Sequence, residues 1–341
     1  MMYDVITMGS NTVDLFVHTD RSEIIDIRSK EGSEEFISYP VGSKMLITKF
    51  MQDFGGNGAN TAVAFARLGL KTAYLGEIGK DHYGSLILKA LQKEKIGFIG
   101  TRGDASGISI ILDSIEDDRT ILVYKGCNND LRLKDISLKK LNAKWLYLTS
   151  MLGESLITMK AVAAHAKKNN IKIAFNPSAT LLENECKSAL ELLSFTDVLV
   201  LNKEEAEALA GKNSQEENIQ KLLSHGPKVI AITDGKNGAV AYNDGYYYKI
   251  GVNKEVKVVE TTGAGDAFAS TMTAGIIMGK PFEDCLKMAI INAESEISRH
   301  GAQNLLLSRR QMMEQLSKDK RPVEKKKVEW HVNAEMANPE R

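Results

Sequence analysis

The chain has 341 residues, enough for one large α/β domain with a smaller accessory element or for two modest domains. Apolar residues make up 43% and charged residues 26%, which is ordinary for a soluble globular protein. Because the formal net charge is zero, the composition gives no electrostatic reason to expect nucleic acid or an anionic membrane as a partner.

The N-terminus and the cysteines indicate a cytoplasmic protein. The chain starts directly with an apolar strand and has no basic region or cleavage site of a secretory signal. No apolar run approaches the length of a membrane span. Three cysteines, Cys127, Cys186 and Cys285, lie far apart without metal-ligand spacing, which favours buried thiols in a reducing compartment.

A strand and a glycine-rich loop come first along the chain. The apolar run 3–8 ends at a Gly-Ser turn, and the carboxylate of Asp14 follows a few residues later. Further on, the sequence F-G-G-N-G-A-N-T precedes a predicted helix. Its adjacent glycines, Gly55 and Gly56, let the backbone approach a ligand closely, and Asn60 can donate to and accept from a polyol. A tight loop before a packed helix is the alternative interpretation.

Short strand-like pieces around this loop predict a small second sheet. They are separated by charged or glycine turns and show no helical periodicity; they are 35–39, 45–48, 108–112 and 120–124. The last two are joined by an acidic turn and form a hairpin candidate. We therefore expect a β-lid made of 15–50 and 107–127, and the apolar residues on both faces of 108–112 suggest a homodimer through this lid.

After the lid, strands and helical patterns alternate. The predicted strands are 145–149, 171–175, 198–201 and 229–233, and the predicted helices include 155–169 and 204–210. Such βαβ alternation predicts an α/β fold with a doubly wound, mainly parallel sheet flanked by helices. The core then comprises 1–14, 51–106 and 128–317. Residues 318–341 have little apolar content and are expected to form a solvated tail.

Two polar motifs follow strands in this part of the chain, where ligands of α/β sheets gather. Asn202 begins a helix, and Glu205 three residues later fits a capping box. The same carboxylate also suits Mg²⁺, which keeps several waters and needs few direct ligands. Thr233 and Gly235 end the next strand, where the isolated sequence indicates only a turn.

A glycine turn followed by a carboxylate stands out at 258–278. Two valines, Val258 and Val259, suggest the end of a strand, and a helical pattern follows the turn. The turn consists of Gly263, Ala264 and Gly265. Unpaired N–H groups and the positive end of a helix dipole suit a phosphate there. Asp266 would repel an anion, but it is well placed to take a proton from a hydroxyl group that attacks phosphorus. A simple helix cap is the alternative.

These motifs occur without a P-loop and without a dinucleotide-binding G-x-G-x-x-G after the first strand. Their order resembles the ribokinase-like (PfkB) family of carbohydrate kinases over about residues 3 to 307. Gly55 to Asn60 is similar to its first signature, two Gly, a variable residue and Gly-Ala-Asn. Thr261 to Asp266 is similar to the second signature, and Asn202 with Glu205 matches its N-x-x-E motif.

The resemblance implies an ATP-dependent kinase that transfers the γ-phosphoryl group to a hydroxymethyl group of a sugar. Asp266 is then the general base, and the amides of Gly263, Ala264 and Gly265 form the anion hole. The implied sugar-binding residues are Asp14, Gly55, Gly56 and Asn60. The implied nucleotide-binding residues are Asn202, Glu205, Thr233 and Gly235, with Glu205 holding Mg²⁺ through water.

Two residues depart from the family pattern, one just before the implied sugar-binding Asp14 and one at the family's potassium site. Thr12 stands where ribokinase usually has Asn, so ribose itself is not implied. Glu260 stands in place of the Asp that helps to hold potassium in the family, and its side chain is one methylene longer. By the same resemblance, Asn292 and the segment 298–302 are expected near the adenine or the monovalent cation.

Two other functions remain open from the sequence. A nucleoside kinase of the adenosine or inosine type uses the same loops to hold a ribose. A sensor that binds sugar or nucleotide without catalysis has a related fold, but the intact glycine turn with Asp266 argues against it.

Overall fold

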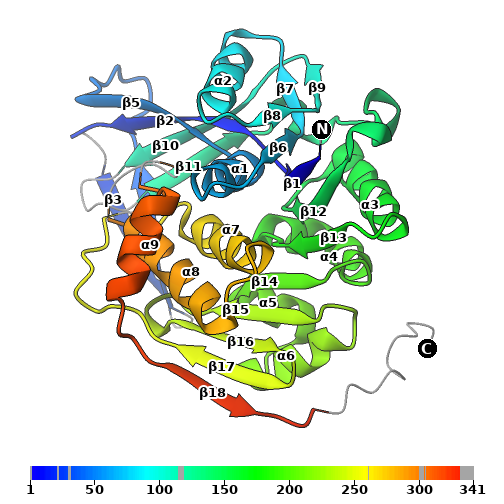
Figure 1. The fold of residues 1–341 in the computed structure, drawn as a ribbon. Helices are drawn as coiled ribbons and strands as arrows, with labels where there is room; N and C mark the ends of the chain where they lie inside the picture. Colours follow the sequence, from blue (N-terminus) through cyan, green and yellow to red (C-terminus); the bar gives the residue numbers. More distant parts are fainter. Residues whose placement is uncertain are drawn as a thin grey trace.

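A ten-stranded sheet organises the molecule, with helices on its two faces (Figure 1). The computed structural model describes residues 2–20, 23–29, 32–113, 119–259, 261–298, 303 and 305–330. In spatial order the strands are β18 (Val323–Lys327), β17 (Tyr246–Ile250), β16 (Ala239–Asn243), β15 (Val229–Thr233), β14 (Val198–Asn202), β13 (Lys172–Phe175), β12 (Ala143–Leu148), β1 (Tyr3–Met8), β6 (Thr72–Leu75) and β8 (Gly97–Phe98). From β15 to β8 neighbouring strands run parallel, whereas β16, β17 and β18 pair antiparallel, so the predicted mainly parallel sheet is confirmed.

The helices divide between two hydrophobic layers. One layer contains α3 (Gly153–Lys168), α4 (Ala179–Leu193), α5 (Lys203–Ala210) and α6 (Gln215–Leu223). The other contains α1 (Asn57–Arg67), α7 (Ala264–Ile277), α8 (Phe282–Glu296) and α9 (Arg309–Lys318), and α2 (His82–Lys93) packs beside α1. The central parallel strands are buried from both sides, as expected for a parallel sheet covered by helices. This arrangement brings the carboxyl ends of the strands to one edge.

The lid is a separate four-stranded sheet, ordered β11 (Arg119–Tyr124), β10 (Gly107–Asp113), β2 (Thr12–His18) and β5 (Lys49–Gly55). The predicted hairpin is confirmed, because β10 and β11 pair antiparallel. The expected boundaries after residues 14 and 50 fall inside β2 and β5. The lid sheet therefore carries Asp14 and Gly55 itself, so two of the predicted sugar-binding residues lie on it and not on the core.

Smaller elements complete the chain. A hairpin of β3 (Glu23–Ser29) and β4 (Gly32–Ser38) forms its own two-stranded sheet, as do β7 (Glu77–Gly79) and β9 (Thr101–Gly103). Short 3₁₀ turns are η1 (Gly126–Asn129), η2 (Leu133–Asp135), η3 (Leu138–Lys140) and η4 (Gly235–Asn237). Two strand predictions are wrong: 45–48 forms an irregular segment before β5, and Val258 and Val259 lie in an irregular, exposed segment.

The expected solvated tail needs a correction over 318–330. Strand β18 pairs along the whole of β17, and Trp330 beyond it stacks on Tyr242 with ring centroids 5.2 Å apart. The side chains of β18 are mostly exposed, which explains its polar sequence. An edge strand pairs through its backbone groups, so the low apolar content of this segment does not exclude a strand there. Residues 331–341 lie outside the described residues.

Candidate active site

The predicted site residues converge where the strands of the core end. Asn202, at the end of β14, lies directly beside Thr233, at the end of β15, in the register of the two strands. The turn after β1 contacts the glycine loop, because the amides of Gly58 and Ala59 donate to the Ser10 carbonyl at 3.0 and 3.2 Å. The start of α7 lies against α1 through side-chain hydrogen bonds described below. The motifs are thus brought to one edge of the sheet, as expected for an open α/β fold.

Asp266 lies in the first turn of α7 but does not cap it. Gly263 is the N-cap residue, and no side chain caps this helix. The Asp266 carboxylate instead accepts hydrogen bonds from α1: Asn57 Nδ2 donates to Oδ1 at 3.1 Å, and Asn60 Nδ2 donates to Oδ2 at 3.0 Å. The capping alternative is therefore excluded. Two amides from the glycine loop hold the carboxylate in a fixed orientation.

The pKa of Asp266 is raised to about 6 from an ordinary value of 3.8. Burial is the main cause, because it disfavours the charged form, and the hydrogen bonds from Asn60 and Asn57 act in the opposite direction. A carboxyl group with a pKa near 6 is ionised at neutral pH and is still a stronger base than an exposed aspartate. This is the property that a general base needs.

A further amide orients Asn60. Gln303 Nε2 donates to Asn60 Oδ1 at 2.9 Å, which directs the Asn60 NH₂ group toward Asp266. The backbone of Gln303 is held in turn by Arg67 of α1, whose Nη1 donates to the Gln303 carbonyl at 2.6 Å. Gln303 and Asn57 were missed from the sequence. Asn57 occupies the variable position of the first signature, so only its hydrogen bond to Asp266 reveals it.

The glycines of the first loop make room for protein atoms. A Cβ on Gly56 would lie 2.6 Å from the Asn11 Cα, and its φ of 90° also favours glycine. A Cβ on Gly55 would lie 2.1 Å from Asp14 Oδ2. The Asp14 carboxylate is buried here and accepts a hydrogen bond from Thr12 Oγ1 at 2.9 Å. In this structure Gly55 and Gly56 therefore determine where Asp14 and the turn after β1 lie.

The glycine turn before α7 has a different character. Gly263 has a φ of 85°, in the left-handed region, and its carbonyl accepts from the Ala267 amide at 2.8 Å. A Cβ on Gly265 would meet no heavy atom within 4 Å, so the backbone there borders open space. The Ala264 amide donates to the Thr261 carbonyl at 3.2 Å. This long turn bond would have to be exchanged before Ala264 could donate to an anion.

That open space belongs to a cavity of 670 Å³. Thr233, Gly235, Ala264 and Gly265 line its polar end, and Lys236 and Lys254 also border it. The remaining wall is largely apolar, with Val252, Val256, Val258, Phe268, Ile290 and Ile297. A cavity of this volume with one apolar region and one end rich in backbone amides suits a nucleotide.

Asn202 and Glu205 form the capping box that the sequence indicated. Asn202 Oδ1 accepts from the Glu205 amide at 2.8 Å, and Glu205 Oε2 accepts from the Asn202 amide at 2.9 Å. The pKa of Glu205 is raised to about 7: burial is the main cause, the hydrogen bond from the Asn202 amide acts in the opposite direction, and the charge of Asp266 adds to the rise. A cation near Glu205 would favour the charged form of its carboxyl group.

Comparisons with known proteins identify the family. Residues 24–309 match the model of the pfkB family carbohydrate kinase. The chain belongs to the pfkB family of carbohydrate kinases. The predicted ribokinase-like fold and sugar kinase activity, a phosphotransferase reaction with an alcohol acceptor, are thereby confirmed.

Individual relatives within the pfkB family differ in their named substrates. The chain is 29% identical to a ribokinase of Lactococcus lactis, over 89% of this chain and 93% of the relative. It is 26% identical to the 5-dehydro-2-deoxygluconokinase of Bacillus subtilis, over 77% of this chain and 85% of the relative. The structure of Arabidopsis thaliana ribokinase complexed with ribose and ATP superimposes with a TM-score of 0.76 at 22% identity, covering 93% and 99% of the two chains.

Two other expectations from the pfkB resemblance concern the C-terminal part of the site. Asn292 is fully buried and is bonded to its neighbours: its Nδ2 donates to Thr271 Oγ1 at 2.7 Å, and its Oδ1 accepts from the Leu307 amide at 2.9 Å. It therefore connects α7 and α8 to the segment before α9 and does not line the 670 Å³ cavity. Glu260, expected near a monovalent cation, and 299–302 lie outside the described residues.

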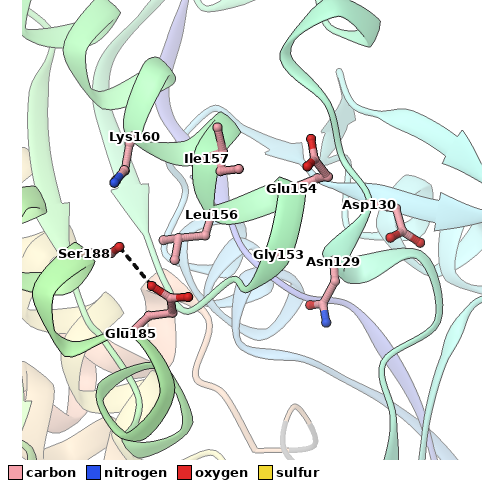
Figure 2. A pocket seen from close by; sticks show the side chains of 9 residues that line it. All are labelled: Asn129, Asp130, Gly153, Glu154, Leu156, Ile157, Lys160, Glu185 and Ser188. Carbon is pink, nitrogen blue, oxygen red and sulfur yellow. Dashed lines mark hydrogen bonds between the residues drawn. The ribbon is translucent and has the colours of Figure 1, made fainter.

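A second hollow, of 420 Å³, lies between α3, α4 and the end of η1 (Figure 2). Its polar groups do not converge on one point. Lys160 forms an ion pair with Glu191 at 2.7 Å, and Ser188 donates to Glu185 at 3.1 Å, as the dashed line in Figure 2 marks. None of the residues predicted for the kinase site lines it.

Proposed function

We propose that this protein is an ATP-dependent sugar kinase that transfers the γ-phosphoryl group to a hydroxymethyl group of a carbohydrate, with Asp266 as the general base. One observation carries the proposal. The loop expected to hold the sugar and the helix expected to hold the phosphate meet at the Asp266 carboxylate, through Asn57 and Asn60. A carboxylate oxygen has two lone-pair sites, so each oxygen can still accept a hydrogen bond from a substrate hydroxyl group.

The sugar half of the proposed site is made of side chains. Asp14 and Asn60 bind the hydroxyl groups of the sugar. Gly55 and Gly56 have no side chain, which leaves room for Asp14 and for the turn before it. Asp266 takes the proton of the attacking hydroxyl group as the new P–O bond forms. Asn57 and Asn60 keep the carboxylate oriented during this step.

The nucleotide half is made mainly of backbone and apolar surface. The base and ribose occupy the apolar part of the 670 Å³ cavity, and the phosphates extend toward Gly235 and the start of α7. The amides of Gly263, Ala264 and Gly265 stabilise the charge on the transferring phosphoryl group, with the Ala264 amide exchanging its bond to Thr261. The ribokinase of Arabidopsis thaliana, which has the same fold and forms a complex with ribose and ATP, supports this choice of donor.

The donor set fits Mg²⁺ held mainly by phosphates and water. Among the described residues, no group of three or more His, Cys, Asp or Glu could hold a metal ion by itself. Glu205 is buried and its pKa is raised, so a cation bound nearby would favour its charged form, which can order the waters of that cation. When bound, Mg²⁺ neutralises charge on the phosphates. Potassium near Glu260 remains a proposal that rests on the family resemblance.

An ADP-release screen tests the proposal. Pentoses, hexoses, keto-deoxy sugar acids and nucleosides are offered with ATP and Mg²⁺, each with and without K⁺. We expect turnover with one class of sugar and little with nucleosides. A preference for adenosine or inosine would change the acceptor to a nucleoside. Tight ATP binding with no turnover on any acceptor would contradict the proposal and favour the sensor.

We also propose a homodimer through the lid and a cytoplasmic location. Strand β11 presents four consecutive large residues at 42–58% exposure, Ile121, Leu122, Val123 and Tyr124, which is unusual for the edge of a sheet in water. Light scattering of the wild type and of Leu122→Lys checks the dimer, and a monomeric wild type would contradict it. The use of ATP and the three free cysteines support the cytoplasm. No helix in the described ranges is long and apolar enough to span a membrane.

A further inference from the structure

The C-terminal segment makes an ionic contact at the wall of the nucleotide cavity. Arg321 lies between the end of α9 and β18, and its guanidinium binds Glu294 of α8 through two hydrogen bonds. Nη1 donates to Glu294 Oε1 at 3.0 Å and Nη2 donates to Oε2 at 2.8 Å. The side chains of Arg321 and Glu294 are only 16% and 13% exposed. Bidentate pairs of this kind are geometrically specific, and this one is partly shielded from water.

Arg321 is itself oriented by a neighbour. Asp319 Oδ2 accepts from Arg321 Nε at 2.6 Å, and Asp319 Oδ1 accepts from the Arg321 amide at 2.8 Å. The Asp319 side chain is 8% exposed. All three guanidinium nitrogens of Arg321 therefore donate hydrogen bonds within the protein. Nη1 makes a second one, to the Gly251 carbonyl at 3.3 Å.

Glu294 transmits this contact to the cavity. Its Oε1 accepts from the Asn253 amide at 2.6 Å. Glu294 and Asn253 line the 670 Å³ cavity, and so do Val252 and Val256 on either side of Asn253. The segment 251–259 has no strand or helix of its own, so this hydrogen bond is one of the few that hold the wall that it forms, together with those at Gly251 and Val259.

We propose that Arg321 is a positioning residue for the nucleotide: by holding Glu294, it fixes the 251–253 segment in the shape that binds the base. The inference rests on the proposed function, because it takes the cavity to be the nucleotide site. Arg321 lies beyond residues 24–309, the part of the chain that the family model matches.

Three variants and one control test the inference. Arg321→Met removes the charge and keeps much of the length, and Arg321→Lys keeps the charge but not the bidentate geometry. Glu294→Gln keeps an acceptor for the Asn253 amide and removes the ion pair. The control is Lys325→Met on β18, because Lys325 forms an ion pair with Glu283 at 2.9 Å and lies over the Tyr246 ring, away from the cavity.

The measurements are ATP affinity by calorimetry, the KM values for ATP and for the sugar, kcat, and the melting temperature. We expect Arg321→Met and Glu294→Gln to weaken ATP binding about tenfold, as befits the loss of one shielded charge pair. Arg321→Lys should recover about a third of this loss on the logarithmic scale. The KM for the sugar, and kcat at saturating ATP, should stay at the wild-type values. Lys325→Met should leave ATP affinity unchanged.

Two results would overturn the inference. The first is unchanged ATP affinity in a folded Arg321→Met protein. The second is a lower melting temperature with equal losses for ATP and sugar, which would mean that Arg321 only stabilises the fold. A wild-type protein that binds no ATP would overturn the proposed function and this inference together, and the binding measurement on the wild type distinguishes that case.

Discussion

The proposed sugar half and the proposed nucleotide half of the site are built in different ways. On the sugar side, side chains hold side chains: Gln303 orients Asn60, and Asn57 and Asn60 orient Asp266. On the nucleotide side, bare backbone at Gly235 and Gly265 faces a cavity with largely apolar walls. It follows that binding in the sugar half depends on which side chains are present. Binding in the nucleotide half depends on the free space and on the position of the main chain.

Replacing Asp266, the proposed base, should have the largest effect. In Asp266→Asn the hydroxyl proton has no acceptor of suitable basicity, so we expect kcat to fall by about 10²- to 10⁴-fold. Binding of ATP and sugar should change little, because the amide has nearly the same shape. ADP release and calorimetry measure the two effects. Wild-type kcat in this variant would show that Asp266 is not the base.

A methyl group at Gly265 should affect the nucleotide half alone. The Cβ meets no protein atom within 4 Å, so the free energy of unfolding should not fall. It would occupy space beside the phosphates, and we expect kcat/KM for ATP to drop about 100-fold, or about 2.7 kcal/mol. Gly275→Ala in the same helix is the matched control. Its Cβ would lie 2.7 Å from Cys285 Sγ, so it should lower the melting temperature and leave the KM for ATP unchanged.

A methyl group at Gly55 should affect the sugar half alone. It would lie 2.1 Å from Asp14 Oδ2 and displace that carboxylate. We expect the KM for the sugar to rise about tenfold, with the KM for ATP unchanged. Asp14→Asn should act through the same contact, so the double variant should be less than additive. If the effects of the two substitutions on the KM for the sugar were fully additive, Gly55 would not act through its contact with Asp14.

Removing Asn57 should shift the pH dependence of the reaction. The wild-type rate should fall below about pH 6, where Asp266 becomes protonated. The Asn57 amide stabilises the carboxylate, so Asn57→Ala should raise the pKa of Asp266 and move the acid limb of kcat/KM up by about one pH unit. Asn184→Ala, which removes an exposed amide bonded to the Thr180 carbonyl, is the control and should leave the profile unchanged.

The smallest expected effect is on stability. A carboxyl group whose pKa is raised on folding favours the folded state below pH 4 and loses this advantage as pH rises through about 6. Asp266→Asn should therefore match the wild type near pH 4 and have a larger free energy of unfolding than the wild type at pH 7.5. Denaturant titration at the two pH values measures this difference. A gain that is equal at pH 4 and pH 7.5 would exclude ionisation of Asp266 as its cause.

The same contrast explains what could be predicted from the sequence. Strand periodicity placed β1, β12, β14 and β15, because buried parallel strands leave an unambiguous apolar run. The glycine turn before Asp266 was recognisable since a left-handed N-cap followed by a carboxylate is a local feature. Val258 and Val259 were misassigned because an exposed loop that borders a cavity can be as apolar as a strand end.

Contacts between distant segments could not be predicted. Asn57 stands in a variable position and bonds to a residue 209 positions away. Gln303 reaches Asn60 across 243 positions. Neither residue type has a spacing pattern that signals such a bond. The C-terminal strand was missed for a related reason, since its pairing with β17 uses backbone groups and leaves charged side chains in water.

The paired C-terminal strand also covers an edge of the sheet that would otherwise be open. Without it, β17 would expose a row of unpaired N–H and C=O groups with which another protein chain could pair. This strand contains three consecutive tyrosines, Tyr246, Tyr247 and Tyr248. Strand β18 covers that row and replaces it with a rim of lysines that repel a second copy. A chain cut after residue 318 should fold its core and then precipitate, as turbidity on concentration would reveal.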